Sequence, residues 1–409
     1  MSRRKVAVIG GGAAGMMAAI FAARHGDAVT VFEKNAKIGR KLYITGKGRC
    51  NLTNNCDSKT VIENTPTNGR FLYSALNRFS PADTMRFFEE NGLPLKTERG
   101  HRVFPVSDKA ADVVDTLLHT AKREGVQITF QRVDELLIKD GTVIGMKTGT
   151  KELLFDKVIV ACGGCSYPLT GSTGDGYHFA RQAGHTVTTL KPSLVPLETE
   201  EIIPAEMVQL LLKNVALTVI DTRQGGKKLY TDFGELQFMR YGVAGAVMLS
   251  ASAHMKEMSP ERYRLLIDLK PALSEEKLEA RLLREINARH RETVSSLLRS
   301  LLPAAMLMLF LSKAGLSPDK NCSEITRTER RQLLMLLKAF PLTVKGFRPI
   351  EEAIVTSGGV SVREIDPKTM ASKLVKGLYF AGEVIDVDAY TGGFNLQCAF
   401  ATGVLAGEA

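Results

Sequence analysis

The chain of 409 residues has no apolar run long enough to cross a bilayer, which takes about 18 consecutive apolar residues. The nearest candidate, residues 301–311, is too short. Arg3 and Arg4 precede an apolar stretch, as in a secretory signal, but glycines interrupt that stretch and no cleavage-like site follows it. We therefore expect a soluble, cytoplasmic protein that does not bind a membrane.

The sequence also lacks low-complexity tracts, internal repeats and a disulfide framework. Its six cysteines are too few to form a disulfide framework in a chain of this size, and their number fits a protein of a reducing compartment. No metal site is predicted. A hydrophobic fraction of 44% and a charged fraction of 24% are ordinary for globular proteins, and the length favours two or three domains. The net charge of +10 suits a polyanionic partner, or no specific partner at all.

The N-terminal segment carries a dinucleotide-binding pattern. A short apolar strand leads into Gly10, Gly12 and Gly15, which have G-x-G-x-x-G spacing, and a helix is predicted from Met16 onward. Gly10 permits the tight turn, Gly12 lets a pyrophosphate approach the backbone, and Gly15 allows close packing of helix and strand. The helix N-terminus attracts phosphate, and Glu33, which ends the next strand, is placed to accept hydrogen bonds from a ribose. The alternative is a structural glycine-rich turn.

A second glycine-rich loop, residues 34–55, is strongly basic. Gly46 and Gly48 break any regular element there, and the asparagines favour turns. The basic residues next to the predicted phosphate site, from which we expect further contacts with anions, are Arg40, Lys41, Lys47 and Arg49. A solvated basic loop is the alternative.

Residues 68–183 predict helices alternating with short strands. Two helices meet at Ser80, a good N-cap followed by proline, and residues 95–104 predict a hairpin. Ser107 is predicted to cap a helix over residues 110–124. Residues 153–160 are predicted to form one apolar strand.

The strand over residues 153–160 leads into Cys162, Gly163 and Gly164. A buried strand that ends in small residues suits close approach of the backbone to a ligand. Because Cys165 completes a C-x-x-C spacing, a redox dithiol is the alternative. No helix pattern starts at the first cysteine, so backbone contact is the favoured interpretation.

The pattern changes near residue 190. Residues 197–268 predict a small β-domain, and residues 274–339 predict helices with caps at Ser274 and Ser317. From about residue 345 the pattern again predicts short strands with small residues. The helical region is the most cationic part of the chain, which predicts either a solvated face or a surface for nucleic acid. Its basic residues are Arg281, Arg284, Arg289, His290, Arg291, Arg299, Arg327, Arg330 and Arg331.

Three long motifs make the chain resemble the HI0933-like family of bacterial flavoproteins, which includes aminoacetone oxidase and bile-acid flavin reductase relatives. They cover residues 39–54, residues 102–110, and a C-terminal set at 355–360, 364–367, 377–388 and 392–397. The resemblance extends over nearly the whole chain. It implies an α/β fold with a Rossmann-like FAD domain split in sequence, an inserted β-barrel-like domain and a small helical domain.

The resemblance, combined with the sequence pattern, divides the chain at stated positions. The FAD-binding domain is expected at residues 1–195 and 345–409. The inserted β-domain is expected at 196–270 and the helical domain at 271–344.

The resemblance also implies roles at the site. Gly382 and Glu383, with Asp386 nearby, would face the ribityl-phosphate end of FAD. A helix opening at Gly392 and Gly393 would aim its N–H groups at the pyrimidine edge of the flavin, where its dipole stabilises negative charge. The full set of expected cofactor-binding residues is Gly10, Gly12, Ala13, Ala14, Gly15, Glu33, Lys34, Arg40, Lys41, Thr45, Gly46, Gly48, Arg49, Cys50, Asn51, Val133, Cys162, Gly163, Gly164, Gly382, Glu383, Asp386, Gly392, Gly393, Phe394, Asn395 and Leu396.

One segment of the inserted domain departs from the family. Relatives carry a Phe-Thr-x-x-Gly-x-Ser-Gly-Pro type of sequence, whereas Met239, Ala244 and Ala246 stand here in place of the threonine, serine and proline. If this segment faces the substrate, a polar contact is lost or changed. The substrate of any single relative is therefore not carried over.

The function expected from these features is FAD-dependent reduction of an activated C=C bond, in an unsaturated 3-oxo steroid or bile acid or in a uracil of ribosomal RNA. A second glycine fingerprint is absent, so NAD(P)H is expected to donate electrons while bound only transiently. The alternatives are an amine oxidase of the aminoacetone type that makes peroxide, and a flavin-containing RNA-binding protein without catalysis. No protein partner is indicated. Candidates for the proton donor are Tyr167 and Arg49, which lie in glycine-rich loops. His101 and His178 are candidates only by their proximity to the motifs.

Overall fold

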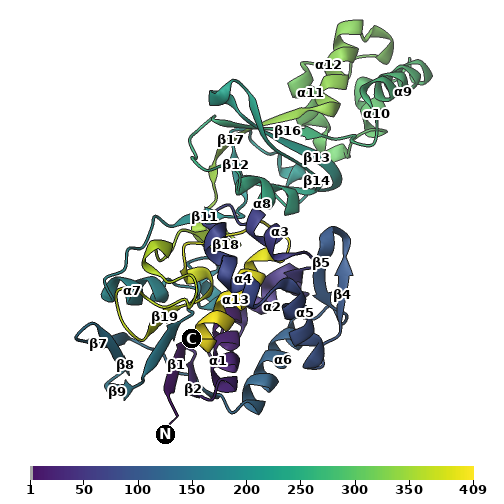
Figure 1. Cartoon of the computed structure of the whole chain (residues 1–409). Coiled ribbons are helices and arrows are strands. Elements are labelled where there is room, and N and C mark those ends of the chain that lie inside the picture. The colour runs from purple at the N-terminus through teal and green to yellow at the C-terminus, as the bar shows by residue number, and fades with distance from the viewer. Residues whose placement is uncertain (1–2) are drawn as a thin grey trace. The chain divides into compact units, whose positions relative to one another are not determined.

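The computed structural model describes residues 3–409 and divides into two compact units (Figure 1). One unit is built from the chain up to Ser193 together with Ile350–Ala409, and the other is Leu194–Pro349. The first unit is therefore discontinuous in sequence. Among the described residues, no helix is both long and apolar enough to span a membrane.

A five-stranded parallel sheet forms the centre of the first unit. Its strand order is β19-β10-β1-β2-β6. The strands are β1 (Lys5–Ile9), β2 (Ala28–Phe32), β6 (Gln127–Thr129), β10 (Lys157–Val160) and β19 (Leu378–Phe380). Because β1 lies between β2 and the much later β10, the order of the strands reverses beside β1. In open α/β sheets such a switch point, at the carboxyl ends of the strands, is where ligands bind.

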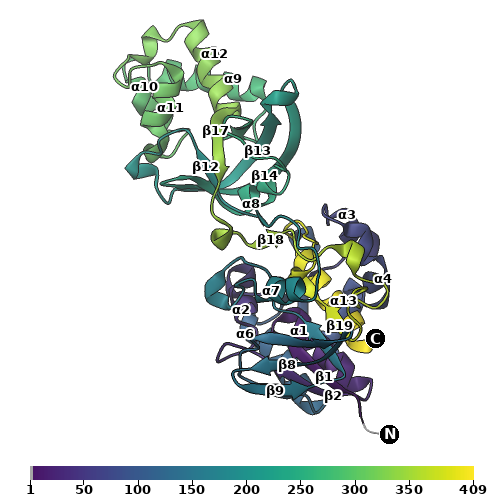
Figure 2. The same cartoon turned by 90° about the vertical axis from the view of Figure 1, so that its left-hand side faces the viewer.

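Two buried helices, α1 (Ala13–Arg24) and α13 (Phe394–Glu408), pack side by side in this unit (Figure 2). They run parallel, because Gly403 lies against Ala14 and Gly407 lies against Ala18. A Cβ atom on Gly403 would be 2.3 Å from Ala14 O, and one on Gly407 would be 2.5 Å from Ala18 O. Only glycine fits at these two positions.

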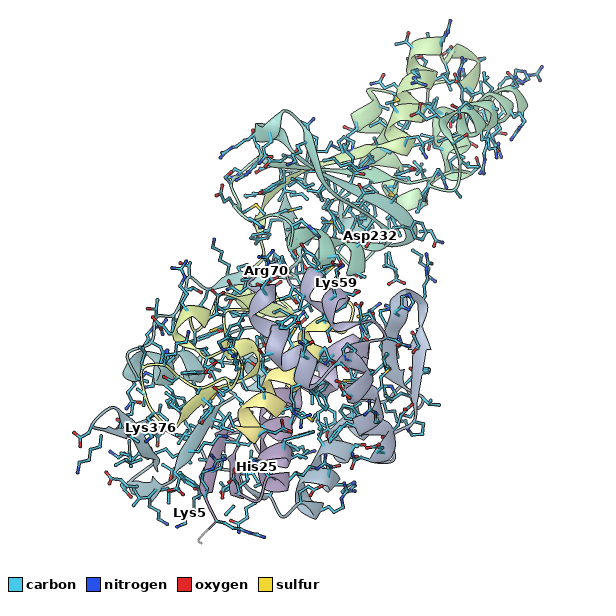
Figure 3. The ribbon with its side chains drawn as sticks, in the orientation of Figure 1. Lys5, His25, Lys59, Arg70, Asp232 and Lys376 are labelled. Atoms are coloured by element: carbon cyan, nitrogen blue, oxygen red, sulfur yellow. The ribbon has the colours of Figure 1, made fainter. Side chains whose placement is uncertain are left out.

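Shorter elements complete the first unit. The helices are α2 (Arg40–Ile44), α3 (Ser58–Glu63), α4 (Tyr73–Arg78), α5 (Pro81–Glu90), α6 (Ala110–Arg123) and α7 (Asp175–Gln182). One small antiparallel sheet contains β3 (Thr53–Asn54), β4 (Leu95–Glu98) and β5 (Arg102–Pro105). A second contains β7 (Glu135–Lys139), β8 (Thr142–Thr148) and β9 (Lys151–Leu154). The third pairs β11 (Lys191–Ser193) with β18 (Val355–Ser357). Lys376 joins the loop before β19 to the β7–β8 hairpin, since its N–H donates to Gly141 and its carbonyl accepts from Val143 (Figure 3).

Most of the local predictions for this unit are confirmed. Ser80 caps α5 in a reciprocal capping box with Asp83, and β4 and β5 form the predicted hairpin. The cap predicted at Ser107 is wrong: the N-cap is Lys109, and the Ser107 hydroxyl accepts from the Lys109 N–H at 3.4 Å.

The single strand predicted over residues 153–160 is also wrong. It is two strands, β9 and β10, which belong to different sheets. Asp156 lies between them and turns the chain, because its N–H donates to Lys5 O and its carboxylate accepts from Lys5 N at 2.7 Å.

The second unit contains a closed barrel with the order β12-β15-β14-β13-β16-β17. Its strands are β12 (Leu197–Thr199), β13 (Leu211–Asp221), β14 (Lys227–Met239), β15 (Gly242–Ala244), β16 (Tyr263–Asp268) and β17 (Phe340–Phe347). The helices are α8 (Ala246–Ser252), α9 (Glu275–Ala288), α10 (Val294–Arg299), α11 (Leu307–Ala314) and α12 (Arg327–Lys338). β17 follows the helices, pairs with both β12 and β16, and spans the predicted boundary between residues 344 and 345.

The helical segment of this unit has caps at both predicted and unpredicted positions. Ser274 caps α9 as predicted, whereas Ser317 lies in a turn and accepts from the Asp319 N–H. Sequence analysis missed Thr293, which caps α10. It also missed Thr326, which forms a capping box with Glu329 at the start of α12. Its T-x-x-E signature was present in the sequence.

The α1–α13 contact predicts that Gly403→Ala destabilises the first unit. Overpacking a buried site costs about 1–3 kcal/mol, because the added methyl group would meet the backbone of Ala14, which cannot yield as a flexible side chain does. Urea unfolding followed by circular dichroism measures the change. Gly346→Ala is the control, since a Cβ atom there meets nothing within 4 Å. Equal stability of the two variants would contradict the prediction.

Candidate functional site

The N-terminus of α1 lies at the carboxyl end of β1 and is not capped by the protein. Its N-cap, Gly12, provides no side-chain hydrogen bond, and the first turn has no acidic residue. Among residues 3–409, the N–H groups of Gly12, Ala13 and Ala14 find no acceptor. A Cβ atom on Gly12 would meet nothing within 4 Å, so the space in front of these donors is open. Free donors and the positive end of the helix dipole together suit a phosphate.

The predicted ribose-binding acid, Glu33, is buried beside this N-terminus. Its Oε2 accepts from the N–H of Gly11 at 2.8 Å, and its Oε1 accepts from the N–H and the side-chain amide of Asn35 at 2.8 and 2.6 Å. A carboxylate has about four lone-pair sites, so about one remains on Oε2. The residue fits a ribose hydroxyl and is held in place without it.

Beyond Glu33, Lys34 connects this end of the site to a pocket beside α7. Lys34 Nζ is 2.7 Å from the carboxylate of Asp175 and 2.5 Å from the hydroxyl of Thr173. The pocket has a volume of about 250 Å³. It is lined by Arg132, Val133, Asp134, Thr173, Gly174, Asp175, His178 and Phe179. Val133, distant from Lys34 in sequence, thus lies in the same region.

Glu383 is the centre of a hydrogen-bonded cluster near the start of α1. Its Oε1 accepts from the Thr356 N–H at 2.8 Å and from the Ser166 hydroxyl at 3.1 Å, and its Oε2 accepts from Lys41 Nζ at 2.8 Å. A Cβ atom on the preceding Gly382 would be 2.7 Å from the Cβ of Ala14, which presses this turn against α1. Sequence analysis missed Ser166 and Thr356 as the anchors of Glu383, although Thr356 lies within a family motif.

Cys162 and Cys165 do not have the properties of a redox dithiol. Both are free, and the Cys162 thiol donates to the carbonyl of Ile9 at 3.4 Å. Burial raises the pKa of both thiols, whereas reactive cysteines have a lowered pKa. A Cβ atom on Gly164 would be 2.5 Å from Thr356 Oγ1, so packing within the protein accounts for this glycine.

Arg49 and His101, two of the proton-donor candidates, lie with the β4–β5 hairpin. The Arg49 guanidinium is 2.9 Å from Glu98 and 3.1 Å from Asp108, and it stacks 4.0 Å above the ring of Phe104. His101 is exposed and adopts a positive φ of 59°. Arg49 is thus already paired with two carboxylates.

Tyr167, the third candidate, follows Ser166 of the Glu383 cluster. It is half-buried and has a left-handed backbone with φ 52° and ψ 61°. Burial raises the pKa of its hydroxyl, and the negative charge of Glu352 raises it further. The hydroxyl therefore carries its proton at neutral pH. His178, by contrast, is exposed on α7.

The remaining predicted residues of the basic loop make contacts within the protein. The Thr45 hydroxyl donates to Leu42 O at 2.7 Å, and Arg40 donates to the side-chain oxygen of Asn35 at 3.0 Å. Cys50 is buried with a φ of 61°, and burial raises its pKa to about 12. Gly46 and Gly48 also have positive φ values, as a tight turn requires.

The N-terminus of α13, like that of α1, has no side-chain cap. Its N-cap, Gly393, has a φ of 98° and provides no side-chain cap. Within the described chain, the N–H groups of Phe394, Asn395 and Leu396 donate to nothing. The Asn395 amide instead bonds the backbone N–H and carbonyl of Ala389.

The two helix ends point in the same direction, because α1 and α13 are parallel. Ala14 is the second residue of α1, whereas its contact Gly403 is the tenth of α13. The eight-residue difference, at 1.5 Å per residue, puts the N-terminus of α13 about 12 Å beyond that of α1. Such an offset suits a long ligand with a phosphate at one point and a second electron-rich group further along.

Burial also affects Asp386, the other acid predicted to contact the cofactor. Desolvation raises its pKa, as does the neighbouring Asp388 carboxylate, while hydrogen bonds from Thr188 and Asn68 act in the opposite direction. Asp388 itself is buried and accepts from the hydroxyls of Ser193 and Ser357, both at 2.8 Å. These two acids belong to the loop between β19 and α13.

Comparison with known proteins places these features in one family. The family model described as HI0933-like protein Rossmann domain matches residues 4–409. A 3-dehydro-bile acid delta(4,6)-reductase of Clostridium scindens is 33% identical over 99% of this chain and 98% of its own length. A ribosomal RNA dihydrouridine synthase of Haemophilus influenzae is 30% identical over 97% of this chain and 95% of its own length.

Solved structures support the fold. The crystal structure of a 3-ketosteroid delta1-dehydrogenase from Sterolibacterium denitrificans superposes with a TM-score of 0.53 and covers 98% of both chains. Its sequence identity is 14%, so this likeness concerns the fold alone.

The open N-terminus of α1 predicts opposite effects of Gly12→Asp on binding and on stability. Aspartate is a favourable N-cap, and the backbone of Gly12, at φ −85°, accepts any side chain. The apoprotein should therefore keep its thermal midpoint or gain slightly. A carboxylate in front of the free N–H groups should instead repel a dinucleotide, so the purified variant should lack bound FAD by absorbance at 450 nm.

Gly12→Ala is the matched variant, since it adds a methyl group without charge. It should retain FAD far better than Gly12→Asp does. Full FAD occupancy in Gly12→Asp would show that phosphates do not bind at this helix end.

Proposed function

The chain belongs to the HI0933-like family of Rossmann-fold flavoprotein oxidoreductases, and on that premise we propose that it reduces a C=C bond activated by a carbonyl group. The observation that carries the proposal is the pair of uncapped, parallel helix ends beside Glu33 and Glu383. We also propose that the protein acts in the cytoplasm, which its six free cysteines fit.

The two named relatives have one chemical feature in common. A 3-dehydro bile acid with delta(4,6) unsaturation has C=C bonds conjugated to a ketone. Uridine, the precursor of dihydrouridine, has a C=C bond conjugated to a ring carbonyl. In each case conjugation makes the distal carbon electron-poor and able to accept hydride. The shared chemistry supports reduction of a conjugated C=C bond more directly than it supports either substrate.

Each end of the site has a part in holding FAD. The free N–H groups of α1 would hold the pyrophosphate, and Glu33 would bind the adenosine ribose. The Glu383 cluster would position the ribityl chain, and the N–H groups of α13 would face the electron-rich edge of the flavin. When bound, reduced FAD supplies hydride to the substrate, and a second proton must come from a side chain or from solvent.

The donor of electrons is proposed to be NADH or NADPH. Gly10, Gly12 and Gly15 form the single dinucleotide fingerprint of the sequence, so the nicotinamide cofactor would bind only transiently. Anaerobic stopped-flow mixing with each nucleotide tests this, and bleaching of the flavin absorbance is the expected result. Absence of bleaching with both would remove NAD(P)H as the donor.

Tyr167 is the proposed proton donor. It keeps its proton at neutral pH, it is half-buried, and its backbone is in a region that is unfavourable for a tyrosine, as is common at functional sites. Tyr167→Phe should lower kcat at least about tenfold and leave the flavin spectrum and the stability unchanged. His101→Ala is the comparison, and it should retain activity. An unchanged kcat in Tyr167→Phe would assign the proton to solvent.

The substrate is proposed to be a free small molecule with a conjugated ketone. The helical segment is less cationic than its composition indicates, because several of its arginines are paired. Arg281 and Arg289 contact Glu285, Arg330 contacts Glu279, and Arg331 contacts Glu275.

The second candidate substrate, ribosomal RNA, is favoured by the net charge of +10 and by the dihydrouridine synthase relative. Arg284, Arg291, Arg299 and Arg327 form no ion pair within the described residues, so an anionic surface could still contact them.

Reoxidation of the reduced holoprotein separates the alternatives. The protein is reduced without oxygen and mixed with a 3-oxo-4,6-diene steroid, with unmodified ribosomal RNA, or with air. Fast reoxidation by the steroid, independent of salt, is the expected result. Fast reoxidation by RNA that falls steeply with salt would establish the second candidate.

Two outcomes would contradict the reductase. Reoxidation by air alone, with peroxide formed, would identify an oxidase of the amine-oxidising type. A reducible flavin that no acceptor reoxidises would indicate a non-catalytic RNA-binding protein. Gly12→Asp, tested under the same conditions, controls for reactions of free flavin.

A further inference from the structure

The segment from Asn51 to Asn54 lies against the first turn of α13 and makes specific bonds to it. With both of its polar atoms satisfied, the Asn51 amide accepts from the Gly393 N–H at 3.0 Å and donates to the carbonyls of Thr53 and Val103 at 3.0 and 3.2 Å. The side chain therefore binds the N-cap of α13 on one side and the strand β5 on the other.

Asn54 makes a second bridge of the same kind. Its buried amide donates to Gly392 O at 3.1 Å and to Gly100 O at 3.0 Å. One amide group thus holds the turn before α13 and the tip of the β4–β5 hairpin together. Neither asparagine adds a net charge.

Between the two asparagines, Thr53 fixes the helix one turn further along. Its hydroxyl donates to Gln397 Oε1 at 2.7 Å, and both side chains are fully buried. A Cβ atom on Gly393 would be 2.3 Å from Thr53 O, so the turn is pressed directly onto this segment. Consecutive contacts from residues 51, 53 and 54 leave the start of α13 little freedom to move.

We propose that Asn51 and Asn54 are positioning residues that hold the free N–H groups of α13 at a fixed place and thereby raise the reduction potential of the bound flavin. This inference rests on the proposed function, since it requires FAD in the site. It assigns a purpose to two asparagines of a basic loop in which Lys34, Lys41 and Arg49 are paired with acids.

The physical basis is the sensitivity of a helix terminus to distance. The N-terminus of a helix carries about half a positive charge, and its effect falls off within the first turn. Reduction adds electrons to the flavin, so a positive end held close to it stabilises the reduced form more than the oxidised form. If the turn loosens, this difference diminishes even though the helix remains folded.

The test measures the midpoint potential of bound FAD in Asn54→Ala and Asn51→Ala, together with the Kd of the apoprotein for oxidised FAD. We expect reduced FAD to lose about tenfold more affinity than oxidised FAD, which lowers the potential by about 30 mV for a two-electron couple. Two variants are used because loss of the buried Asn54 amide could prevent folding. Asn51→Gln, which retains an amide, should recover part of the potential.

Thr84→Val is the control variant. The Thr84 hydroxyl donates to Gln397 Oε1 at 2.7 Å and, within the described residues, makes no hydrogen bond to Gly392 or Gly393. Its loss should lower stability and leave the potential unchanged. A merely structural role of the asparagines predicts the same behaviour for all variants.

Two failures are distinguishable. A wild-type protein that binds no FAD would overturn the proposed function. A wild-type protein that binds FAD, with an unchanged potential in both asparagine variants, would overturn only the positioning role.

Discussion

The direct backbone contact between α1 and α13 is the constraint on which the site depends. Gly403 and Gly407 let α13 approach so closely that any side chain there would overlap the backbone of α1. This contact makes the helices parallel and fixes how far one N-terminus extends beyond the other. Gly382 continues the same close packing, because it lies against Ala14. Gly403 and Gly407 thereby determine the separation of the two groups of free N–H donors.

The backbone, more than the basic side chains, makes this site attractive to an anion. Lys34 is paired with Asp175, Lys41 with Glu383 and Arg49 with Glu98. These pairs neutralise three cations of a loop whose composition is strongly cationic. Within the described residues, the peptide N–H groups at the starts of α1 and α13 have no acceptors. They have fixed directions, so they select the position and shape of a ligand as well as its charge.

The sequence predicted several of the features that local spacing determines. The fingerprint from Gly10 to Gly15 and the cap at Ser80 depend on neighbours within a few residues, and both were found. Contacts distant in sequence were not predictable: nothing near Gly403 indicates that it faces Ala14, and nothing near Arg49 indicates Glu98. The strand predicted over residues 153–160 failed for the same reason, since a distant bond between Asp156 and Lys5 divides it. The family resemblance predicted that Glu383 belongs to the site. Its hydrogen bonds with Ser166 and Thr356 could be found only from the structure.

The barrel of the second unit is completed by strands from its two ends. β12 pairs with β17, and every helix from α9 to α12 lies between them in sequence. During synthesis β12 therefore leaves the ribosome long before β17 does. The barrel cannot close, and one edge of β12 stays unpaired, until residues 340–347 have been made. Strands that are far apart in sequence pair slowly, and an unpaired strand edge can pair with another chain. The helices between β12 and β17 thus prolong the time for which the nascent barrel exposes an unpaired strand edge.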